Sequence, residues 1–447
     1  MIHSIIEVVR RFKQEWTSQL DDQAIEQVCR EKGMSWRQTV LTPLVTIKVF
    51  FLQVLHGNTA CEHLRHLARM CFTGAAYCEA RMRIPLVVFQ ALVEHAANRM
   101  KEEISDEGCW LGHRLFYVDG SSFSMPDKPC LQREFGQPGA QKKGCGFPMA
   151  HFLSLMHAGT GMVVKVLTSP LRTHDISGML EIHAELREGD VLAGDRGFCS
   201  FAHLALLLGR GVQAVFRIHQ RQIVDFTPAR AHVVTGKGSN RGQKGLPRSR
   251  WIRAFGFQDQ LVEWFKPADC PDWISAEQYA SLSGSLKVRE LRYRVDCKGF
   301  RTKEITLVTT LIDAEIYSAK ELASMYHRRW TIETSFGHLK TTMKMDVLKC
   351  KTVDGVLKEL AVFVLIYNLV RLVMLEASRC QKVEVDRISF IDALRWLMSA
   401  CPDDELCDLV VNPYRPNRSE PRVVKRRPKT YPLMNRPRGE LKERLLA

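Results

Sequence analysis

Two apolar, strand-like stretches of the chain each run into an aspartate at a glycine-containing turn. One is Val118-Asp119-Gly120 and the other is Gly194-Asp195-Arg196-Gly197. Glycine permits positive φ and lets another backbone approach closely, so each turn can present its carboxylate at the end of a strand. Taken singly, either aspartate is better explained as a turn or capping residue, because aspartate is common in such turns.

A third stretch, YHRRWTIETSFGHLK, changes that balance because it combines an acid with phosphate-binding side chains at helical spacing. Tyr326, Arg329 and Glu333 lie three and four residues apart and share one helical face. Lys340 follows two turns beyond Glu333. Apolar residues between them indicate a partly buried helix, so we expect the polar stripe to face a site. The alternative is an exposed helix that carries ordinary ion pairs.

Three clustered carboxylates suit two divalent metal ions and phosphodiester chemistry. A phosphodiester repels nucleophiles by its negative charge, and two metal ions overcome this by activating the attacking oxygen and stabilising the leaving one. Carboxylates held together without a cation raise one another's pKa, which makes such a cluster costly for structure alone. The three stretches therefore predict a metal-dependent enzyme that cuts and joins DNA.

The charge of the chain favours a polyanionic partner. Lys and Arg number 64 against 49 Asp and Glu, a formal net charge of +15, and neutralising phosphates releases counterions. A basic protein without such a partner is the alternative on charge alone. The 14 scattered cysteines form no C-x-x-C pair, which is typical of a reduced, cytoplasmic protein.

The spacing of apolar residues divides the chain into five parts and predicts an α/β protein. Residues 1–108 have helical spacing, as in either a DNA-end-binding domain or a plain helical bundle. Residues 109–218 and 303–380 are expected to form the two parts of a catalytic core, separated by a β-rich insertion over 219–302. Residues 381–447 are expected to form a C-terminal helical segment and a basic tail.

Two long helices are expected in the second part of the core. One runs from Ser318 to Met343 and the other over residues 353–378. The apolar run at 360–375 is short for a membrane span and is interrupted by Asn368 and Arg371. A buried helix without membrane contact is therefore predicted.

The motifs together resemble those of bacterial DDE transposases of insertion-sequence family four. Residues 326–340 match the family's Y-R-E-K pattern, while Asp119 in DGS and Asp195 in DRG match its other two acids. The tail segment RVVKRRPKTYP is similar to the end of family members. The resemblance runs from about residue 40 to residue 440, and four motifs in the right order make it specific.

The resemblance implies an RNase H-like core, a mixed sheet flanked by helices, with a β-strand insertion before the glutamate. It also implies cut-and-paste transposition: nicking at the transposon end, a hairpin intermediate, and attack of the freed 3′-hydroxyl on target DNA. The implied partners are double-stranded DNA at terminal inverted repeats and at the target, and a second copy of the chain on paired ends. The implied location is the bacterial cytoplasm, at the nucleoid.

The resemblance further assigns a role to each motif residue. Three acids are catalytic and hold two Mg²⁺ or Mn²⁺ ions: Asp119, Asp195 and Glu333. Three side chains grip phosphates of the transposon end near the hairpin: Tyr326, Arg329 and Lys340. Arg196 is a further candidate for DNA contact, with a salt bridge to a neighbouring acid as the alternative.

One departure from the family concerns an aromatic side chain. Some relatives carry a tryptophan shortly before the glutamate helix that stacks on a displaced base, whereas no tryptophan lies between Trp273 and Trp330 here. Several aromatic residues can substitute, although each is more often a core residue: Trp251, Trp264, Trp330, Tyr293 and Phe300.

Two other functions fit the same residues. One is a metal nuclease of the same core that cuts DNA without joining it. The other is a DNA-binding regulator whose acids no longer act, against which the intact acids and the intact Y-R-E-K stripe argue.

Overall fold

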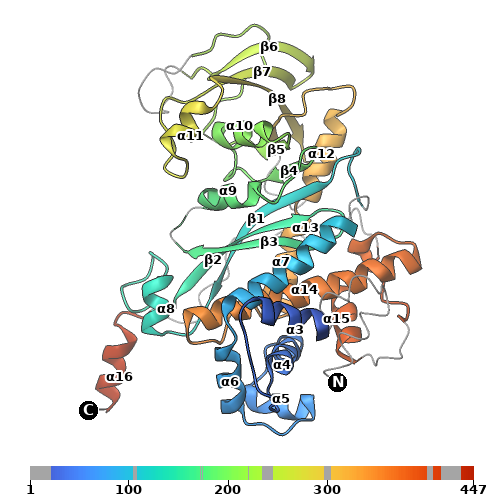
Figure 1. Ribbon diagram of the computed structural model, residues 1–447. Helices are drawn as coiled ribbons and strands as arrows, with labels where there is room; N and C mark the ends of the chain where they lie inside the picture. Colours follow the sequence, from blue (N-terminus) through green and yellow to red (C-terminus); the bar gives the residue numbers. More distant parts are fainter. Residues whose placement is uncertain are drawn as a thin grey trace.

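A nine-stranded mixed sheet with helices on both faces forms the centre of the protein (Figure 1). The computed structural model describes these residues: 22–103, 108–171, 173, 175–219, 221–233, 245–295, 304–399, 406–413 and 434–446. The tail segment RVVKRRPKTYP lies outside the described residues. The sheet and its flanking helices confirm the predicted α/β class.

In the first half of the sheet, β1 has an antiparallel neighbour on one side and a parallel neighbour on the other. β1 (Leu115–Ser124) pairs antiparallel with β2 (Met149–His157), which pairs with β3 (Val163–Pro170). On its other side β1 runs parallel to β4 (Val191–Gly194), and β4 runs parallel to β5 (Gln213–Arg217). The carboxyl ends of β1, β4 and β5 therefore meet at one edge of the sheet.

The second half of the sheet consists of β9, at the start of the expected second part of the core, and three strands from the expected insertion. β9 (Glu304–Thr309) pairs antiparallel with β5, followed outward by β8 (Ser285–Arg294), β7 (Asp259–Phe265) and β6 (Ser249–Gly256). These strands extend the sheet that contains β1, so the described part of the insertion does not form a sheet of its own. Short helices connect the strands: α8 (Pro129–Glu134), η1 (Asp175–Gly178), α9 (Met179–His183), α10 (Phe201–Gly209) and α11 (Ala276–Ser281).

The N-terminal helices follow the predicted apolar spacing. They are α3 (Asp22–Glu31), α4 (Pro43–Leu55), α5 (Cys61–Ala68), α6 (Gly74–Arg83) and α7 (Leu86–Glu103). Thr42 caps α4 by accepting a hydrogen bond from the Val45 amide, as expected for a threonine at this position. α4 and α7 pack against α14 (Val353–Gln381) and share its hydrophobic core.

α14 is the central helix of the protein. It is apolar and long enough to cross a membrane, with a mean hydropathy of 2.0 over its most apolar window, but 89% of that window is buried inside the protein. This burial confirms the predicted core helix. α14 is followed by η3 (Val385–Arg387) and α15 (Phe390–Ser399), and α16 (Arg438–Leu446) ends the described chain.

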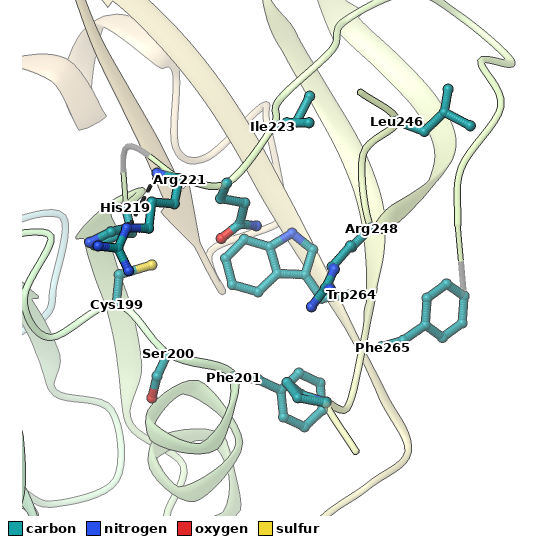
Figure 2. Close-up of a pocket in the computed structure, with 12 residues that line it drawn as sticks. Cys199, Ser200, Phe201, His219, Arg221, Ile223, Leu246, Arg248, Trp264 and Phe265 are labelled. Carbon is teal, nitrogen blue, oxygen red and sulfur yellow. Dashed lines mark hydrogen bonds between the residues drawn. The ribbon is translucent and has the colours of Figure 1, made fainter. Parts of the chain in front are cut away.

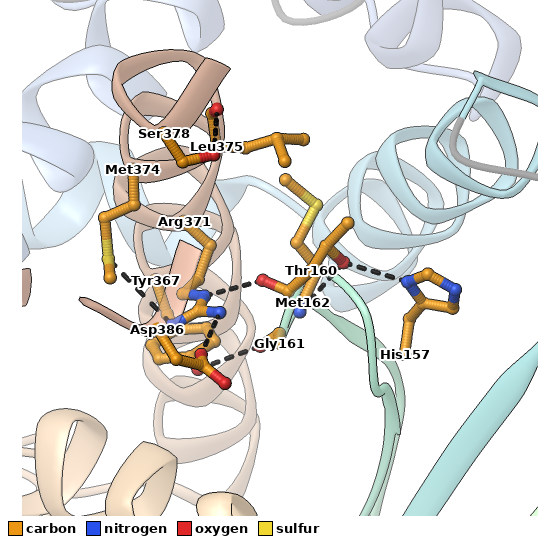
Figure 3. Close-up of polar contacts among 10 residues, drawn as sticks. All are labelled: His157, Thr160, Gly161, Met162, Tyr367, Arg371, Met374, Leu375, Ser378 and Asp386. Carbon is orange, nitrogen blue, oxygen red and sulfur yellow. Dashed lines mark hydrogen bonds and ion pairs between the residues drawn. The ribbon is translucent and has the colours of Figure 1, made fainter. Parts of the chain in front are cut away.

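The two polar residues that interrupt α14 connect it to the turn between β2 and β3 and to the start of β3. Arg371 donates from Nε to the Thr160 carbonyl at 2.7 Å and forms an ion pair with Asp386 at 2.9 Å (Figure 3). Asn368 accepts from the Val163 amide and donates to its carbonyl, at 2.9 and 2.8 Å. Their polarity therefore satisfies backbone groups that the packing buries.

The prediction of one long helix from Ser318 to Met343 is wrong. The segment forms α12 (Ala319–Arg328), a turn, α13 (Thr331–Gly337) and the π-helical turn η2 (His338–Thr342). Backbone bonds tighten at the break, since the Arg329 and Trp330 amides donate to carbonyls three residues back. Trp330, Thr331 and Ile332 are consecutive residues of low helix propensity, and the sequence argument gave their succession too little weight.

Candidate active site

Two of the predicted acids and one arginine lie in a row across three parallel strands. Val118 pairs with Gly194, and Gly194 pairs with Phe216. The next residue on each chain segment is Asp119, Asp195 or Arg217. Because neighbouring strands lie about 4.8 Å apart, this register brings the two aspartates from 76 residues apart in sequence to adjacent positions at the sheet edge.

The row lies on the face of the sheet that α12 and α13 cover. Tyr117, Ala193 and Val215 belong to the core cluster that includes Met325, Tyr326 and Ile332, and side chains alternate between faces along a strand. Residues two positions further along each strand therefore point to the same side. Tyr326 fixes α12 there, because its hydroxyl donates to the Gly194 carbonyl at 3.2 Å.

Arg329 and Asp119 form an ion pair in this buried region. Arg329 Nη1 lies 2.8 Å from Asp119 Oδ2, with the two side chains 6% and 20% exposed. The other carboxylate oxygen, Oδ1, accepts from the Gly120 amide at 2.8 Å. Burial raises the pKa of Asp119 to about 6, and the nearby Asp195 carboxylate adds to the rise, against the opposing effect of the Arg329 guanidinium.

The loop after β4 presents Asp195 at the edge of this site. Asp195 Oδ1 accepts from the Gly197 amide at 2.7 Å. A Cβ at Gly197 would lie 3.0 Å from that same oxygen, which is tighter than ordinary contact and explains the glycine of the DRG motif. Arg196 is exposed in the same loop.

Glu333 does not join the two aspartates in this structure. It is exposed in the first turn of α13, and among the described residues no group of three or more His, Cys, Asp or Glu side chains is spaced to hold a metal. The predicted convergence of all three acids is therefore not seen. One physical reason is that the Arg329 guanidinium, rather than a cation shared by the three acids, neutralises Asp119.

The site nonetheless fits a divalent cation in its chemistry. Carboxylate oxygens are the ligands that Mg²⁺ and Mn²⁺ prefer. Asp119 has a raised pKa in part because Asp195 lies close to it, and such a pair of like charges is relieved by a cation between them. The donor set of the two aspartates thus suits the predicted metal, whereas Glu333 is exposed in the first turn of α13 and is not part of this pair.

Lys340 lies further along β1 rather than on one helical stripe with Arg329. It belongs to the π-helical turn η2, and its Nζ donates to the Ser121 hydroxyl at 3.1 Å. Ser121 is two residues beyond Asp119 on the same face of the strand. Burial lowers the pKa of Lys340, against the effect of Asp346. The cations of the Y-R-E-K motif therefore follow the direction of β1.

One side chain of this region was missed by the sequence argument, and one candidate aromatic lies beside it. The missed residue is Arg217, which ends β5 in the row of the aspartates and whose guanidinium forms no hydrogen bond or ion pair with a described residue. The candidate aromatic is Tyr293 on β8, whose hydroxyl is buried without a hydrogen-bond partner among the described residues and is near enough to Tyr326, Arg217 and Arg329 to interact with them electrostatically. The sequence did contain a signal for Arg217: it is the first charged residue after the strand-like run VQAVF, so it could have been expected at the end of a strand.

A cavity of about 340 Å³ opens beside the loop that carries Asp195 (Figure 2). Cys199 and Ser200 at the start of α10 form one wall, and Trp264 and Phe265 of β7 form another. Arg221 and Arg248 make the lining basic. Trp264 is the candidate aromatic in this cavity, although it is 6% exposed and donates from Nε1 to Glu290 at 2.8 Å.

The other candidate aromatics are placed differently. Trp330 packs edge-on against His327 with ring centroids 4.7 Å apart, at the break between α12 and α13. Trp251 lies on the edge strand β6, and its indole nitrogen is buried without a partner among the described residues. Phe300 lies outside the described residues.

Comparisons with known proteins point to one family. The Transposase DDE domain model matches residues 110–369. The transposase InsG for insertion sequence element IS4, from Escherichia coli K12, is 32% identical over 342 residues, which cover 72% of this chain and 70% of InsG. The putative transposase InsZ of the same organism is 25% identical over 138 residues, which cover 31% of this chain and about half, 46%, of InsZ.

A solved structure is also similar at a lower level. The cryo-EM structure of the piggyBac transposase synaptic complex with hairpin DNA aligns with 87% of this chain and 78% of that chain, at a TM-score of 0.43 and 12% identity. A likeness of this size does not establish a common fold or mechanism.

Proposed function

Because the chain belongs to the bacterial DDE transposases of the IS4 insertion-sequence family, we propose that it cuts DNA at transposon ends and joins the freed 3′ ends to target DNA. The observation that carries this proposal is the adjacency of Asp119 and Asp195: Asp119 lies within β1, at the level where the neighbouring parallel strand β4 ends and Asp195 follows it. A hairpin intermediate, binding to terminal inverted repeats and a dimer on paired ends are parts of the same proposal.

The sheet supports an RNase H-like core for this reaction. Its first five strands have the order β3-β2-β1-β4-β5, in which β1, β4 and β5 are parallel and β2 and β3 are antiparallel. Ligand sites in open α/β sheets lie at the carboxyl ends of parallel strands. The core would run from residue 109 to 218 and from 303 to 380, with the β-rich insertion over 219–302 between them.

The proposed metal ligands are Asp119, Asp195 and Glu333. Two Mg²⁺ or Mn²⁺ ions bound there would activate the attacking oxygen and stabilise the leaving oxygen of the phosphodiester. The two aspartates would hold the ions in place, since a hydrogen bond from the Gly120 or Gly197 amide already orients each carboxylate. Glu333 would complete the ligand set from the exposed first turn of α13.

The cations around the acids would hold the DNA backbone. Arg329 offers a planar guanidinium that suits bidentate phosphate binding. Lys340 would contact the next phosphate along β1, and Arg217 would contact the strand on the β5 side of the acids. Burial raises the pKa of Tyr326 to about 12, so its hydroxyl remains a neutral hydrogen-bond donor at physiological pH. Arg196, exposed beside Asp195, would add a peripheral phosphate contact.

The N-terminal helices are proposed to bind the transposon end. α5 exposes a basic face that includes Arg65, His66 and Arg69. A helix with such a face can lie against DNA phosphates and contribute sequence-independent affinity. Acting on DNA, the protein would work at the nucleoid in the bacterial cytoplasm.

The test is cleavage of a DNA substrate that carries the inverted repeats flanking the gene, in the presence of Mg²⁺. Asp119→Asn, Asp195→Asn and Glu333→Gln should each lower the cleavage rate on the order of 10³-fold, because each removes a ligand charge from the reacting centre. End binding by gel shift should change by no more than about threefold, since phosphate contacts carry most of the affinity.

A matched control is Glu384→Gln, which removes an exposed carboxylate that pairs with Arg328. It should cut at the wild-type rate. Retained Mg²⁺-dependent cutting in any of the three acid variants would refute that residue's role. Cutting by the wild type without hairpin or strand-transfer products would instead identify a nuclease.

A further inference from the structure

We propose that Arg329 competes with the divalent cation for Asp119. In the protein without DNA, the Arg329 guanidinium would keep the cation from the Asp119 carboxylate, and a DNA phosphate would release the carboxylate by binding the guanidinium instead. This inference rests on the proposed function, because it assumes a cation at Asp119 and a phosphate at Arg329. It adds a second role to Arg329: a gate for metal binding as well as a DNA contact.

Both carboxylate oxygens of Asp119 already accept a hydrogen bond, and one of the two donors carries a full positive charge. Oδ2 faces Arg329 Nη1 at 2.8 Å and Oδ1 faces the Gly120 amide at 2.8 Å. Arg329 is only 5% exposed, so surrounding protein keeps its charge beside the carboxylate. Two cations within a few ångströms repel strongly in a partly buried site. Mg²⁺ also dehydrates reluctantly, which further disfavours its binding while the guanidinium is in place.

Arg329 also has unused hydrogen-bonding capacity. Its Nε is buried and has no partner among the described residues. A contrast exists within the protein: Arg289 is equally buried, but it binds Asp259 through both Nε and Nη2 and the Tyr317 carbonyl through Nη1. A buried donor without a partner is costly. A phosphate that accepts from Arg329 would remove that cost, which gives DNA a reason to move the side chain.

The position of Arg329 in the backbone permits such a movement. It occupies the break between α12 and α13, where its amide donates to the Tyr326 carbonyl three residues back. Its guanidinium lies 5.5 Å from the centre of the Tyr326 ring, another group proposed to contact the same phosphates. A phosphate bound beside Tyr326 is therefore within reach of the Arg329 side chain.

The competition couples the two ligands thermodynamically. If DNA removes Arg329 from Asp119, DNA raises the affinity for the cation, and the cation must raise the affinity for DNA by the same factor. Typical couplings of this kind are about 5- to 150-fold. Metal would then bind chiefly to protein that already holds DNA.

The central experiment measures Mn²⁺ binding to the full-length chain without DNA, by electron paramagnetic resonance of the free ion. Arg329→Gln should bind Mn²⁺ about tenfold more tightly than the wild type, within the usual range of such couplings. Lys320→Gln is the control, because it removes an exposed cation in the first turn of α12, nine residues before Arg329. Its Mn²⁺ affinity should stay within about twofold of the wild type, as expected for an exposed charge that solvent and salt screen.

Equal affinities in Arg329→Gln and Lys320→Gln would overturn the proposal. Thermal unfolding checks that the variants are folded. Should Arg329→Gln fail to fold, the wild type alone decides the question: its Mn²⁺ affinity should rise about tenfold when a short duplex is added, after subtraction of binding to the duplex itself. An unchanged affinity would overturn the gate.

Failure of the gate and failure of the proposed function give different results. A wild type that binds no Mn²⁺ with or without duplex contradicts the metal-dependent enzyme itself. Mn²⁺ binding that Asp119→Asn weakens but Arg329→Gln leaves unchanged contradicts only the gate.

Discussion

Two buried arginines, Arg371 and Arg329, each meet an aspartate, but they use their hydrogen-bond donors differently. Arg371 binds the Thr160 carbonyl through Nε, Asp386 through Nη2 and the Met374 sulfur through Nη1 (Figure 3). Arg329 binds Asp119 through Nη1, and its Nε has no partner among the described residues. Each guanidinium nitrogen of Arg371 therefore has a hydrogen-bond acceptor, whereas Nε of Arg329 has none among the described residues.

The difference separates a structural contact from a candidate site. A fully satisfied buried polar network fixes how helices and strands pack, because every member loses energy when one is removed. An incompletely satisfied one is tolerated where a ligand supplies the missing partner. Arg371 joins α14 to the turn between β2 and β3, whereas Arg329 lies at the sheet edge where DNA is proposed to bind.

Replacing each arginine by methionine tests this distinction with the largest expected effect. Arg371→Met should lower the free energy of unfolding by about 1–3 kcal/mol, because the buried Thr160 carbonyl loses its donor, while Asp386, which is 47% exposed, is rehydrated. Arg329→Met should lower it by less, because the unsatisfied Nε donor disappears together with the ion pair and because Asp119, whose pKa burial raises to about 6, can take up a proton. Urea unfolding followed by circular dichroism measures both.

A surface arginine provides the baseline for these two variants. The Arg328 and Glu384 side chains are 65% and 70% exposed and form an ion pair at 3.4 Å, a contact worth at most about 1 kcal/mol. The stability of Arg328→Met should therefore resemble that of the wild type. Equal losses at Arg371 and Arg329 would remove the distinction between structural and functional arginines.

The turn between β2 and β3, which Arg371 binds, should also make the stability of the protein sensitive to acid. Burial, with Arg114 nearby, lowers the pKa of His157 from its ordinary 6.5 to about 4. His157 lies in the same turn, 3.1 Å from the Thr160 hydroxyl. A histidine with a depressed pKa in the folded state contributes stability above pH 6.5, and that stability is lost as the pH falls toward 4. The contribution is roughly 3 kcal/mol.

The measurement is the unfolding midpoint in urea between pH 7 and pH 4. His157→Gln keeps a hydrogen-bonding side chain but does not titrate, so its stability should fall less steeply across this window than that of the wild type. Some slope should remain, because burial also lowers the pKa of His183 to about 4. Parallel curves for the two proteins would show that His157 does not carry the acid sensitivity.

The sequence predicted the parts of this comparison that depend on local pattern. An apolar strand followed by a glycine-containing turn placed Asp195 at the exit of β4, and helical spacing located α14 with its two polar interruptions. These features follow from side-chain periodicity over a few residues. The α/β class followed from the same reasoning. That reasoning also put Asp119 at the end of a strand, which is wrong, because β1 continues through Gly120 to Ser124 in its pairing with β2.

Features that depend on distant pairing were not predicted. Arg217 enters the row of acids only through the parallel register of β4 and β5. The insertion strands join the same sheet because β9 pairs with β5, a contact between segments about 90 residues apart. Arg329 was expected to face phosphate, but its partner in the protein alone is a carboxylate. Register, edge pairing and the partner of a charge are properties of the folded chain.

Lys340 provides the test with the smallest expected effect, because its side chain is only half-buried. It donates to the Ser121 hydroxyl, a neutral group that does not compensate the charge of the ammonium, so Lys340, like Arg329 and unlike Arg371, is incompletely satisfied by the protein. Lys340→Ala should reduce hairpin formation about tenfold, equivalent to about 1.4 kcal/mol in the transition state, and should weaken initial end binding by less. Quantifying hairpin product and end binding on the same labelled DNA separates the two.

Lys320→Ala is the control for charge alone, because Lys320 is exposed in the first turn of α12 and away from the acids. It should leave the ratio of hairpin yield to end binding unchanged. An unchanged hairpin yield in Lys340→Ala would mean that its bond to Ser121 serves packing, so that an uncompensated charge at this edge of the sheet does not by itself mark a DNA contact. A loss of hairpin product without an equal loss of end binding would show that Lys340, like Arg329, contacts DNA. Both side chains lie beside the acids, along β1, with donors that the protein alone does not satisfy.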